Sequence, residues 1–198
     1  MPILREILER LQGRYGRPEA APRREPFEMV LWENVAYLVG DEQREVAFRA
    51  LRERVGTKPA EILAEHRVKK LLRAAQIAQA RFGGNVPAEK RALKLFPSIG
   101  EPGAEKILLF TKTAPVVALE SNGLRVLVRL GYGREEKNYA ATYRSVQEGV
   151  AEEVERDYRW LIRMHRLLRR HGQETCKRTA PRCGECVVAE DCRYYQGR

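Results

Sequence analysis

All four cysteines of the protein lie near its C-terminal end, in the spacing C-x6-C-x2-C-x5-C. Thiolates this close together in sequence are typical ligands of one metal centre. The candidate ligands are Cys176, Cys183, Cys186 and Cys192. A tetrahedral zinc ion and a cubane iron–sulfur cluster both take four thiolates, but zinc sites of this kind usually pair two short knuckles, and only one occurs here. The single knuckle is unusual for zinc, so an iron–sulfur cluster and zinc both stay open here, and two disulfide bonds of a secreted protein are the least favoured reading.

A second candidate site is a turn rich in proline and glycine, residues 96–107, with the sequence FPSIGEPGAEKI. A hairpin centred on Ile99 and Gly100 lets backbone N–H groups at the start of the following helix face outward. Because glycine has no Cβ, a phosphate oxygen can approach this backbone closely. The alternative is a plain turn between two helices, since Pro-x-x-Gly turns are common there.

Together the two motifs resemble those of the endonuclease III and MutY-like DNA glycosylases, the HhH-GPD superfamily, whose hairpin reads approximately L-P-G-V-G-x-K-T-A. The matching residues are Pro97, Ile99, Gly100 and Ala104, whereas Ser98 stands for the first glycine and Gly103 for the threonine. The resemblance covers roughly residues 22–195. It implies an all-α, two-domain helix-hairpin-helix DNA glycosylase fold and a [4Fe-4S] cluster on the four cysteines.

The resemblance also implies how the chain is divided into domains. A six-helix barrel would span residues 23–114, with the helix-hairpin-helix at about 87–114, and an iron–sulfur domain would combine residues 1–22 and 115–198, with the cluster loop at 176–192. Double-stranded DNA would cross the cleft between the two domains, and a nucleotide would be flipped out and its N-glycosidic bond cleaved. The implied DNA-binding residues are Ser98, Ile99, Gly100, Gly103, Lys177, Arg178 and Arg182.

Pro102 occupies the position at which bifunctional members of the family carry the lysine that attacks the sugar C1′ and forms a Schiff base. Proline has no nucleophile, and its fixed φ suits the first turn of a helix. Lys106 lies one helical turn further, a displacement of about 5 Å, which is too far for a direct replacement. The sequence therefore predicts a monofunctional glycosylase without a lyase step.

Glu120 stands where the resemblance places the catalytic aspartate, in the stretch LESNGLRV, with Asn122, Arg125 and Val126 in register. A carboxylate there would stabilise an oxocarbenium-like sugar as the base leaves. The alternative is an ordinary acidic residue that favours a helix N-terminus.

Glu33 is the second candidate catalytic carboxylate, in the middle of an apolar helix. A buried, unpaired charge is costly, so burial would raise its pKa toward that of a general acid. It also lies where MutY-type enzymes, which this chain resembles, carry a proton-donating glutamate. The alternative is a core glutamate satisfied by an arginine.

The composition favours a polyanionic partner, because 37 Lys and Arg residues outnumber 27 Asp and Glu residues among 198 and give a net charge of +10. No apolar run approaches the ~20 residues that span a bilayer, and the first residues do not resemble a secretory signal. We therefore expect a soluble, cytoplasmic, nucleoid-associated monomer that acts in base excision repair. A catalytically silent protein that binds DNA lesions or structures on the same fold is the alternative, and no feature identifies the excised base.

Hydrophobic periodicity predicts that helices position these residues along nearly the whole chain. One apolar helix with Glu33 at its middle is expected at 27–39, closed by Gly40. Residues 115–119 are short enough to be a strand or the start of a buried helix. The other helices are expected at 2–13, 42–55, 59–64, 67–82, 87–95, around 107–109, and at 122–130, 139–154 and 158–170.

Overall fold

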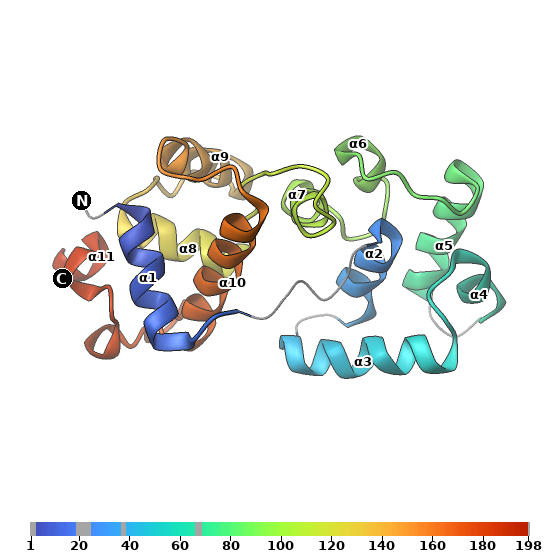
Figure 1. The fold of residues 1–198 in the computed structure, drawn as a ribbon, viewed down its shortest axis with the longest axis horizontal. Coiled ribbons are helices and arrows are strands. Elements are labelled where there is room, and N and C mark those ends of the chain that lie inside the picture. The colour runs from blue at the N-terminus through green and yellow to red at the C-terminus, as the bar shows by residue number, and fades with distance from the viewer. Residues whose placement is uncertain (1–2, 19–24, 37–38, 66–68, 198) are drawn as a thin grey trace. The chain divides into compact units, whose positions relative to one another are not determined.

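The computed structural model describes residues 3–18, 25–36, 39–65 and 69–197, and Figure 1 shows that helices dominate these ranges. No β-strand occurs among the described residues, so the predicted all-α fold class is confirmed. The chain divides into two compact units: Ala21–Ala114 form one, and Met1–Ala20 together with Pro115–Arg198 form the other. The candidate hairpin and Glu33 lie in the first unit, and Glu120 and the cysteines lie in the second.

The unit of residues 21–114 is built around α2 (Pro26–Val35), which packs against α3, α5 and α7 (Figure 1). Its proline lies in the first turn, where a missing N–H costs nothing. Half of its ten residues are buried: Phe27, Met29, Val30, Leu31 and Trp32. The surrounding helices are α3 (Asp41–Arg54), α4 (Pro59–Ala64), α5 (Lys69–Phe82), α6 (Lys90–Leu93) and α7 (Glu101–Phe110).

The bounds of three helices in this unit differ from the prediction by more than one residue. The helix expected to continue to residue 39 ends at Val35, because Ala36 adopts an extended backbone with φ −147°. Residues 37–38, which the predicted helix also included, and the predicted helix start at residue 67 lie outside the described residues. The helix expected at 87–95 is reduced to Lys90–Leu93, whereas the next one begins at Glu101, inside the predicted loop. The apolar pattern of residues 27–39 continues beyond the end of α2, so hydrophobic periodicity alone did not locate that helix end.

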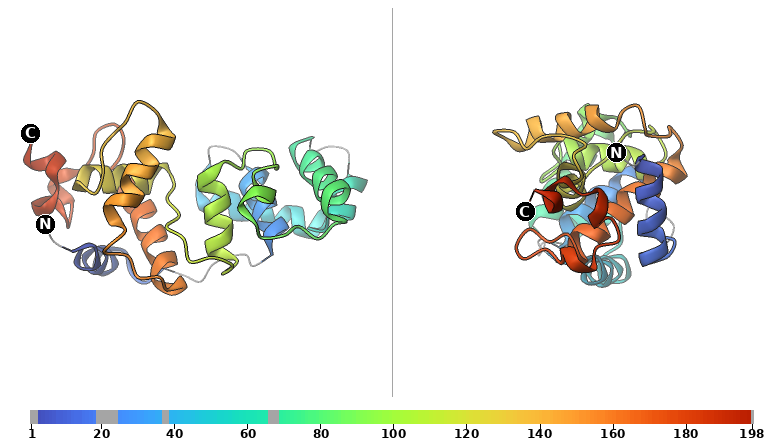
Figure 2. Two further views of the ribbon diagram at one scale, coloured as in Figure 1. Left: turned by 90° about the horizontal axis from the view of Figure 1, so that it is seen from above. Right: turned by 90° about the vertical axis from the view of Figure 1, so that its left-hand side faces the viewer.

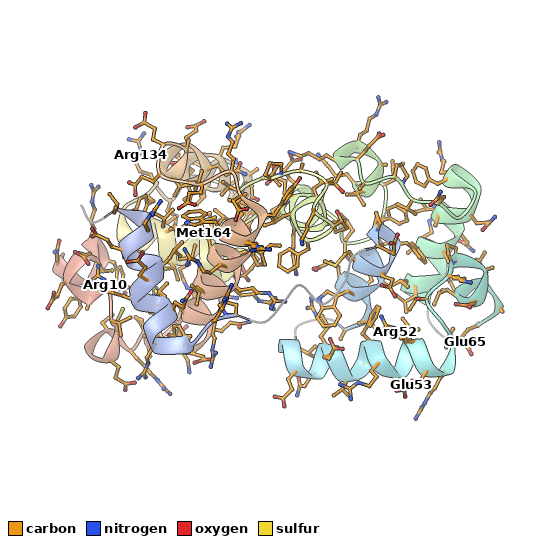
Figure 3. All side chains as sticks on the ribbon, viewed as in Figure 1. Arg10, Arg52, Glu53, Glu65, Arg134 and Met164 are labelled. Atoms are coloured by element: carbon orange, nitrogen blue, oxygen red, sulfur yellow. The ribbon has the colours of Figure 1, made fainter. Side chains whose placement is uncertain are left out.

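In the second unit α10 (Tyr158–Glu174) packs against both α8 (Ser121–Leu130) and α1 (Leu4–Tyr15), and α9 (Tyr139–Val150) packs against α8 (Figure 1). Met164, labelled in Figure 3, is fully buried on α10 at 0% exposure. The first helix was predicted to end at Gly13, but α1 continues to Tyr15. Residues 115–119 form neither a strand nor a helix; Ala118 and Leu119 are buried just before α8 begins.

The cysteine-containing segment has short helical turns of its own, which periodicity did not predict: η1 (Cys183–Glu185), η2 (Ala189–Asp191) and α11 (Arg193–Gln196). The last of these lies against α8, as the views in Figure 2 show. Arg10 of α1, labelled in Figure 3, forms an ion pair with Asp191 of η2. The segment is therefore fixed to two helices of its unit rather than projecting freely from it.

Candidate functional site

The four cysteines line one pocket of about 360 Å³ in the second unit. Cys176 follows the end of α10, Cys183 begins η1, and Cys192 precedes α11, so the end of one long helix and two short helical elements bring the thiols together. Cys192 is buried and the other three are half-buried. Across the described residues, no three His, Cys, Asp or Glu side chains converge closely enough to hold a single metal ion. The four thiols line the same pocket, and four thiolates are the donor set of both a zinc site and a cubane iron–sulfur cluster.

Burial raises the pKa of the Cys186 and Cys192 thiols, and the neighbouring cysteines add to the shift. A thiolate is the form that binds metal, so ligation here must release protons and be favoured by the metal charge. A bound metal would therefore offset the free-energy cost of deprotonating these buried thiols.

Arg129 of α8 connects the pocket to the backbone that follows the first cysteine. Its Nη1 donates to Cys176 Sγ at 3.3 Å and to the Lys177 carbonyl at 2.8 Å. Its guanidinium also lies 4.4 Å from the centre of the Tyr194 ring. The sequence analysis did not name Arg129. Its spacing of four residues from Arg125 places both on the same face of α8, and this spacing was the signal that could have found it.

Glu120 occupies the N-cap position of α8, where its Oε1 accepts a hydrogen bond from the Gly123 backbone N–H at 2.7 Å. Its Oε2 accepts from Asn122 Nδ2 at 2.9 Å. Asn122 Oδ1 in turn accepts from Arg125, 2.8 Å away, and Arg125 Nε donates to the Cys176 carbonyl at 3.0 Å. A continuous hydrogen-bonded chain therefore joins the candidate carboxylate to the backbone of the first cysteine.

Gly172 of α10 makes this chain of contacts possible. A Cβ at this position would lie 2.6 Å from the Asn122 carbonyl oxygen, closer than packed atoms approach. The Gly172 carbonyl also accepts a hydrogen bond from Arg125 at 2.8 Å. The absence of a side chain therefore lets α10 approach the first turn of α8.

The candidate hairpin is a tight turn leading into α7, with Gly100 exposed at the N-cap position. Ser98, which replaces the family glycine, has φ 62°, in the left-handed region that favours glycine. Ile99 is buried and contacts the site of Gly103, where a Cβ would lie 3.5 Å from its side chain. Pro102 lies in the first turn of α7. The backbone thus keeps a left-handed turn despite the serine.

Glu101, at the start of α7, is neutralised by two lysines. Lys90 and Lys94 each place Nζ 2.8 Å from one of its oxygens, and these hydrogen bonds lower the pKa of Glu101. The acidic side chain next to the hairpin therefore carries local counter-charges.

Glu33 belongs to the same unit as the hairpin and is held by residues distant in sequence. Lys106 Nζ of α7 lies 2.6 Å from Glu33 Oε1, and Arg44 Nη1 of α3 lies 3.7 Å from Oε2. The Lys106 and Glu33 side chains are only 9% and 18% exposed. The carboxylate is therefore not the unpaired acid that the apolar helix suggested, and the amine of Lys106 is engaged by it.

Lys177 and Arg178 line a broad, open groove in the second unit, together with Asn122, Arg125 and Tyr139. Arg182 lines the cysteine pocket instead. Two of the three predicted cations therefore share one surface with the first turn of α8. Among the described helices, none is long and apolar enough to cross a membrane.

The chain has relatives in both sequence and structure, although no family model matches it. Endonuclease III of Bacillus subtilis (strain 168) is 26% identical over 136 residues, 69% of this chain and 59% of that protein. Thymine-DNA glycosylase of Aeropyrum pernix is 28% identical over 132 residues, 66% of this chain and 59% of that protein. The matches thus span less than two thirds of these relatives.

Solved structures resemble nearly the whole chain. A trapped endonuclease III–DNA covalent intermediate matches with a TM-score of 0.79 at 18% identity, over 98% of this chain and 96% of that one. A thermostable thymine-DNA glycosylase matches with a TM-score of 0.76 at 16% identity, over 97% and 94% of the two chains. The predicted resemblance to the endonuclease III superfamily and the predicted fold class are thereby confirmed.

Proposed function

We propose that this chain, which shares the fold of the endonuclease III superfamily, is a DNA glycosylase of base excision repair. The observation that carries the proposal is the position of Glu120, whose carboxylate is fixed at the start of α8 by the Gly123 N–H and by Asn122. A rigid carboxylate stabilises positive charge that develops on the sugar as the base leaves, without having to reorganise. The relatives named as DNA glycosylases support the same reaction.

Glu33 is the second catalytic residue of the proposal. Its pairing with Lys106 compensates its charge and supports a role in binding and orienting the base or the attacking water rather than that of an isolated acid. Breaking the pair would leave a largely buried ammonium group without its carboxylate.

The glycosylase is monofunctional in this proposal, because Pro102 replaces the nucleophilic lysine and Lys106 is bonded to Glu33. An amine that is held by a carboxylate on another helix is not placed to attack C1′. The products are therefore intact strands that contain abasic sites.

Double-stranded DNA is bound by backbone groups of the hairpin, at Ser98, Ile99, Gly100 and Gly103, and by the cations Lys177, Arg178 and Arg182. The exposed Gly100 supports a close approach of phosphate oxygens, and the groove next to Lys177 and Arg178 supports contacts along the backbone. The protein acts as a monomer on chromosomal DNA.

A [4Fe-4S] cluster is held by Cys176, Cys183, Cys186 and Cys192, which line one pocket. The chemistry that such a cluster supplies is thiolate-bound iron of tunable reduction potential, which also cross-links the loop. The residues of the chain position the loop: Arg129 bonds a thiol and two carbonyls, at Lys177 and Arg178.

A screen of duplexes, each with one modified or mispaired base, tests the proposal. Alkali treatment should cut only the strand from which a base was released, and borohydride should trap no covalent protein–DNA adduct during turnover. A trapped adduct that is lost in Lys106→Ala would refute the monofunctional assignment alone.

The second candidate is a catalytically silent protein that binds DNA lesions. It is favoured by one observation, that both carboxylates are engaged by other groups of the chain. Tight, salt-dependent binding to a lesion-bearing duplex without any abasic product would support this alternative over the glycosylase.

A further inference from the structure

A buried histidine contacts the cysteine pocket through one ring nitrogen and the N-terminal helix through the other. His171 of α10 is only 1% exposed. Its Nε2 lies 3.5 Å from Cys186 Sγ, and its Nδ1 lies 3.0 Å from the Tyr15 hydroxyl at the end of α1. The two rings also meet edge to face, with centroids 5.9 Å apart.

The chemistry of the ligands fixes the direction of these hydrogen bonds. A cysteine that binds iron is a thiolate and can only accept, whereas a neutral imidazole has one donor nitrogen and one acceptor nitrogen. Nε2 must therefore carry the proton that points to Cys186, which leaves the lone pair of Nδ1 to accept the Tyr15 hydroxyl proton.

Tyr15 is placed to donate in this direction. Its oxygen lies 2.8 Å from Thr175 Oγ1, so the threonine hydroxyl donates to it while it donates to His171. Burial raises the pKa of Tyr15, which keeps the phenol proton in place. Arg170 holds the same tyrosine from the other side, with Nη1 2.9 Å from its carbonyl oxygen.

We propose that Tyr15, supported by Thr175, stabilises the tautomer of His171 whose Nε2–H donates to the Cys186 thiolate, and that this hydrogen bond contributes to the reduction potential of the cluster. The inference rests on the cofactor proposed above. A hydrogen bond withdraws electron density from the sulfur, stabilises the more reduced cluster and raises its potential. Tyr15 and His171 are positioning residues in this scheme, because His171 acts through Cys186 and Tyr15 acts through His171.

Tyr15→Phe is the variant that tests the relay, since it keeps the ring and its packing but removes the proton donor. Tyr158→Phe, at a half-buried tyrosine that begins α10 and does not line the cysteine pocket, is the matched control. The reduction potential of the purified holoprotein is measured by protein-film voltammetry, together with iron content and circular dichroism. We expect Tyr15→Phe to keep its iron and helicity, to have a lower potential and to lose its cluster to ferricyanide severalfold faster than wild type and the control.

Thr175→Val provides a second variant if Tyr15→Phe does not fold, with a smaller shift of the potential in the same direction. Equal potentials in wild type and in the folded relay variant would overturn the inference but leave the cofactor intact. A colourless wild-type protein that holds zinc would overturn the cofactor and the relay together. Because glycosylase activity is not a readout, its absence has no bearing on either outcome.

Discussion

The two candidate carboxylates are held in opposite ways. Glu120 is fixed by neighbours within three residues, Asn122 and the Gly123 N–H, at the start of its own helix. Glu33 is fixed by side chains from two other helices, Arg44 of α3 and Lys106 of α7. The first arrangement is local and depends on one turn of backbone; the second depends on the packing of α2 among its neighbours.

The two units that contain these carboxylates also differ in how they are stabilised. The unit of residues 21–114 has an aromatic core, in which Phe96 lies 6.4 Å from Phe27 and 6.2 Å from Phe82 between ring centroids. The C-terminal part of the other unit, from Cys176 onward, consists of short turns around a pocket lined by cysteines. We therefore expect one unit to be stabilised by packing alone and the other to depend on ligation as well.

The largest effect is expected for Cys183→Ala, which should affect the unit that contains the cysteines and leave the other unit unchanged. Wild-type protein purified without oxygen should be yellow-brown, absorb near ~400 nm and contain about four irons per chain, and the variant should lose all of these. Amide hydrogen exchange should rise in residues 176–192 and in the end of α10, but not in α2, α5 or α7. Val187→Ala, at an exposed position of the same loop, is the control. A colourless native protein with one zinc per chain would contradict the cluster.

The next effect compares the carboxylates directly. Glu33→Gln and Glu120→Gln should each slow base release by ~10²-fold or more, the usual scale for losing an acid or a charge stabiliser, while DNA affinity changes little. Single-turnover release of the base identified in the duplex screen is the measurement. Wild-type rates in both variants would remove these residues from the reaction.

Stability should distinguish the same two variants. Glutamine at 120 still offers an oxygen to the Gly123 N–H, so the helix cap persists. Glutamine at 33 leaves the Lys106 ammonium without its counter-charge and should cost roughly 2 kcal/mol. In urea denaturation, Lys106→Met combined with Glu33→Gln should restore part of that loss. Equal destabilisation by the two single variants would argue against the contrast between local and long-range support.

A smaller effect is expected at the hairpin. A Cβ at Gly100 meets only Pro102 at 3.9 Å, so Gly100→Leu should fold normally while blocking the backbone from phosphates. We expect roughly tenfold weaker binding to every duplex, whatever its sequence. Fluorescence anisotropy over a series of salt concentrations measures it, with Gly13→Leu, on an open face of α1, as the control. Unchanged affinity would remove the hairpin from the DNA interface.

The sequence could predict features that neighbouring residues determine, but not contacts between residues that are distant in sequence. Helix existence depends on neighbouring residues and was predicted from them. Glu120 was found through the family resemblance, and its place at a helix N-terminus was the alternative reading. The ion pair of Lys106 with Glu33 joins α7 to α2, and no local pattern carries that information. The bonds of Arg129 and His171 to the cysteines were missed for the same reason, because they exist only after α8, α10 and the loop have packed.

The smallest effect concerns backbone strain in each unit. Ser98 at φ 62° and Ala180 at φ 49° both adopt the left-handed conformation, which costs a residue with a Cβ about 1–2 kcal/mol. Glycine removes that cost but gives the unfolded chain about 0.5–1 kcal/mol of extra entropy, so each substitution by glycine should stabilise its unit by about 0.5 kcal/mol. Both positions are exposed, which leaves few contacts to lose.

Hydrogen exchange resolved by unit is the measurement, because global melting would mix the two contributions. Ser98→Gly should slow exchange only in helices of residues 21–114, and Ala180→Gly only near the cysteine pocket. Ser98→Ala, which keeps the Cβ, is the control and should give no gain. Since glycine stands at this position in the family pattern, Ser98→Gly should leave DNA affinity intact; a loss of stability would mean that the serine side chain supports the turn.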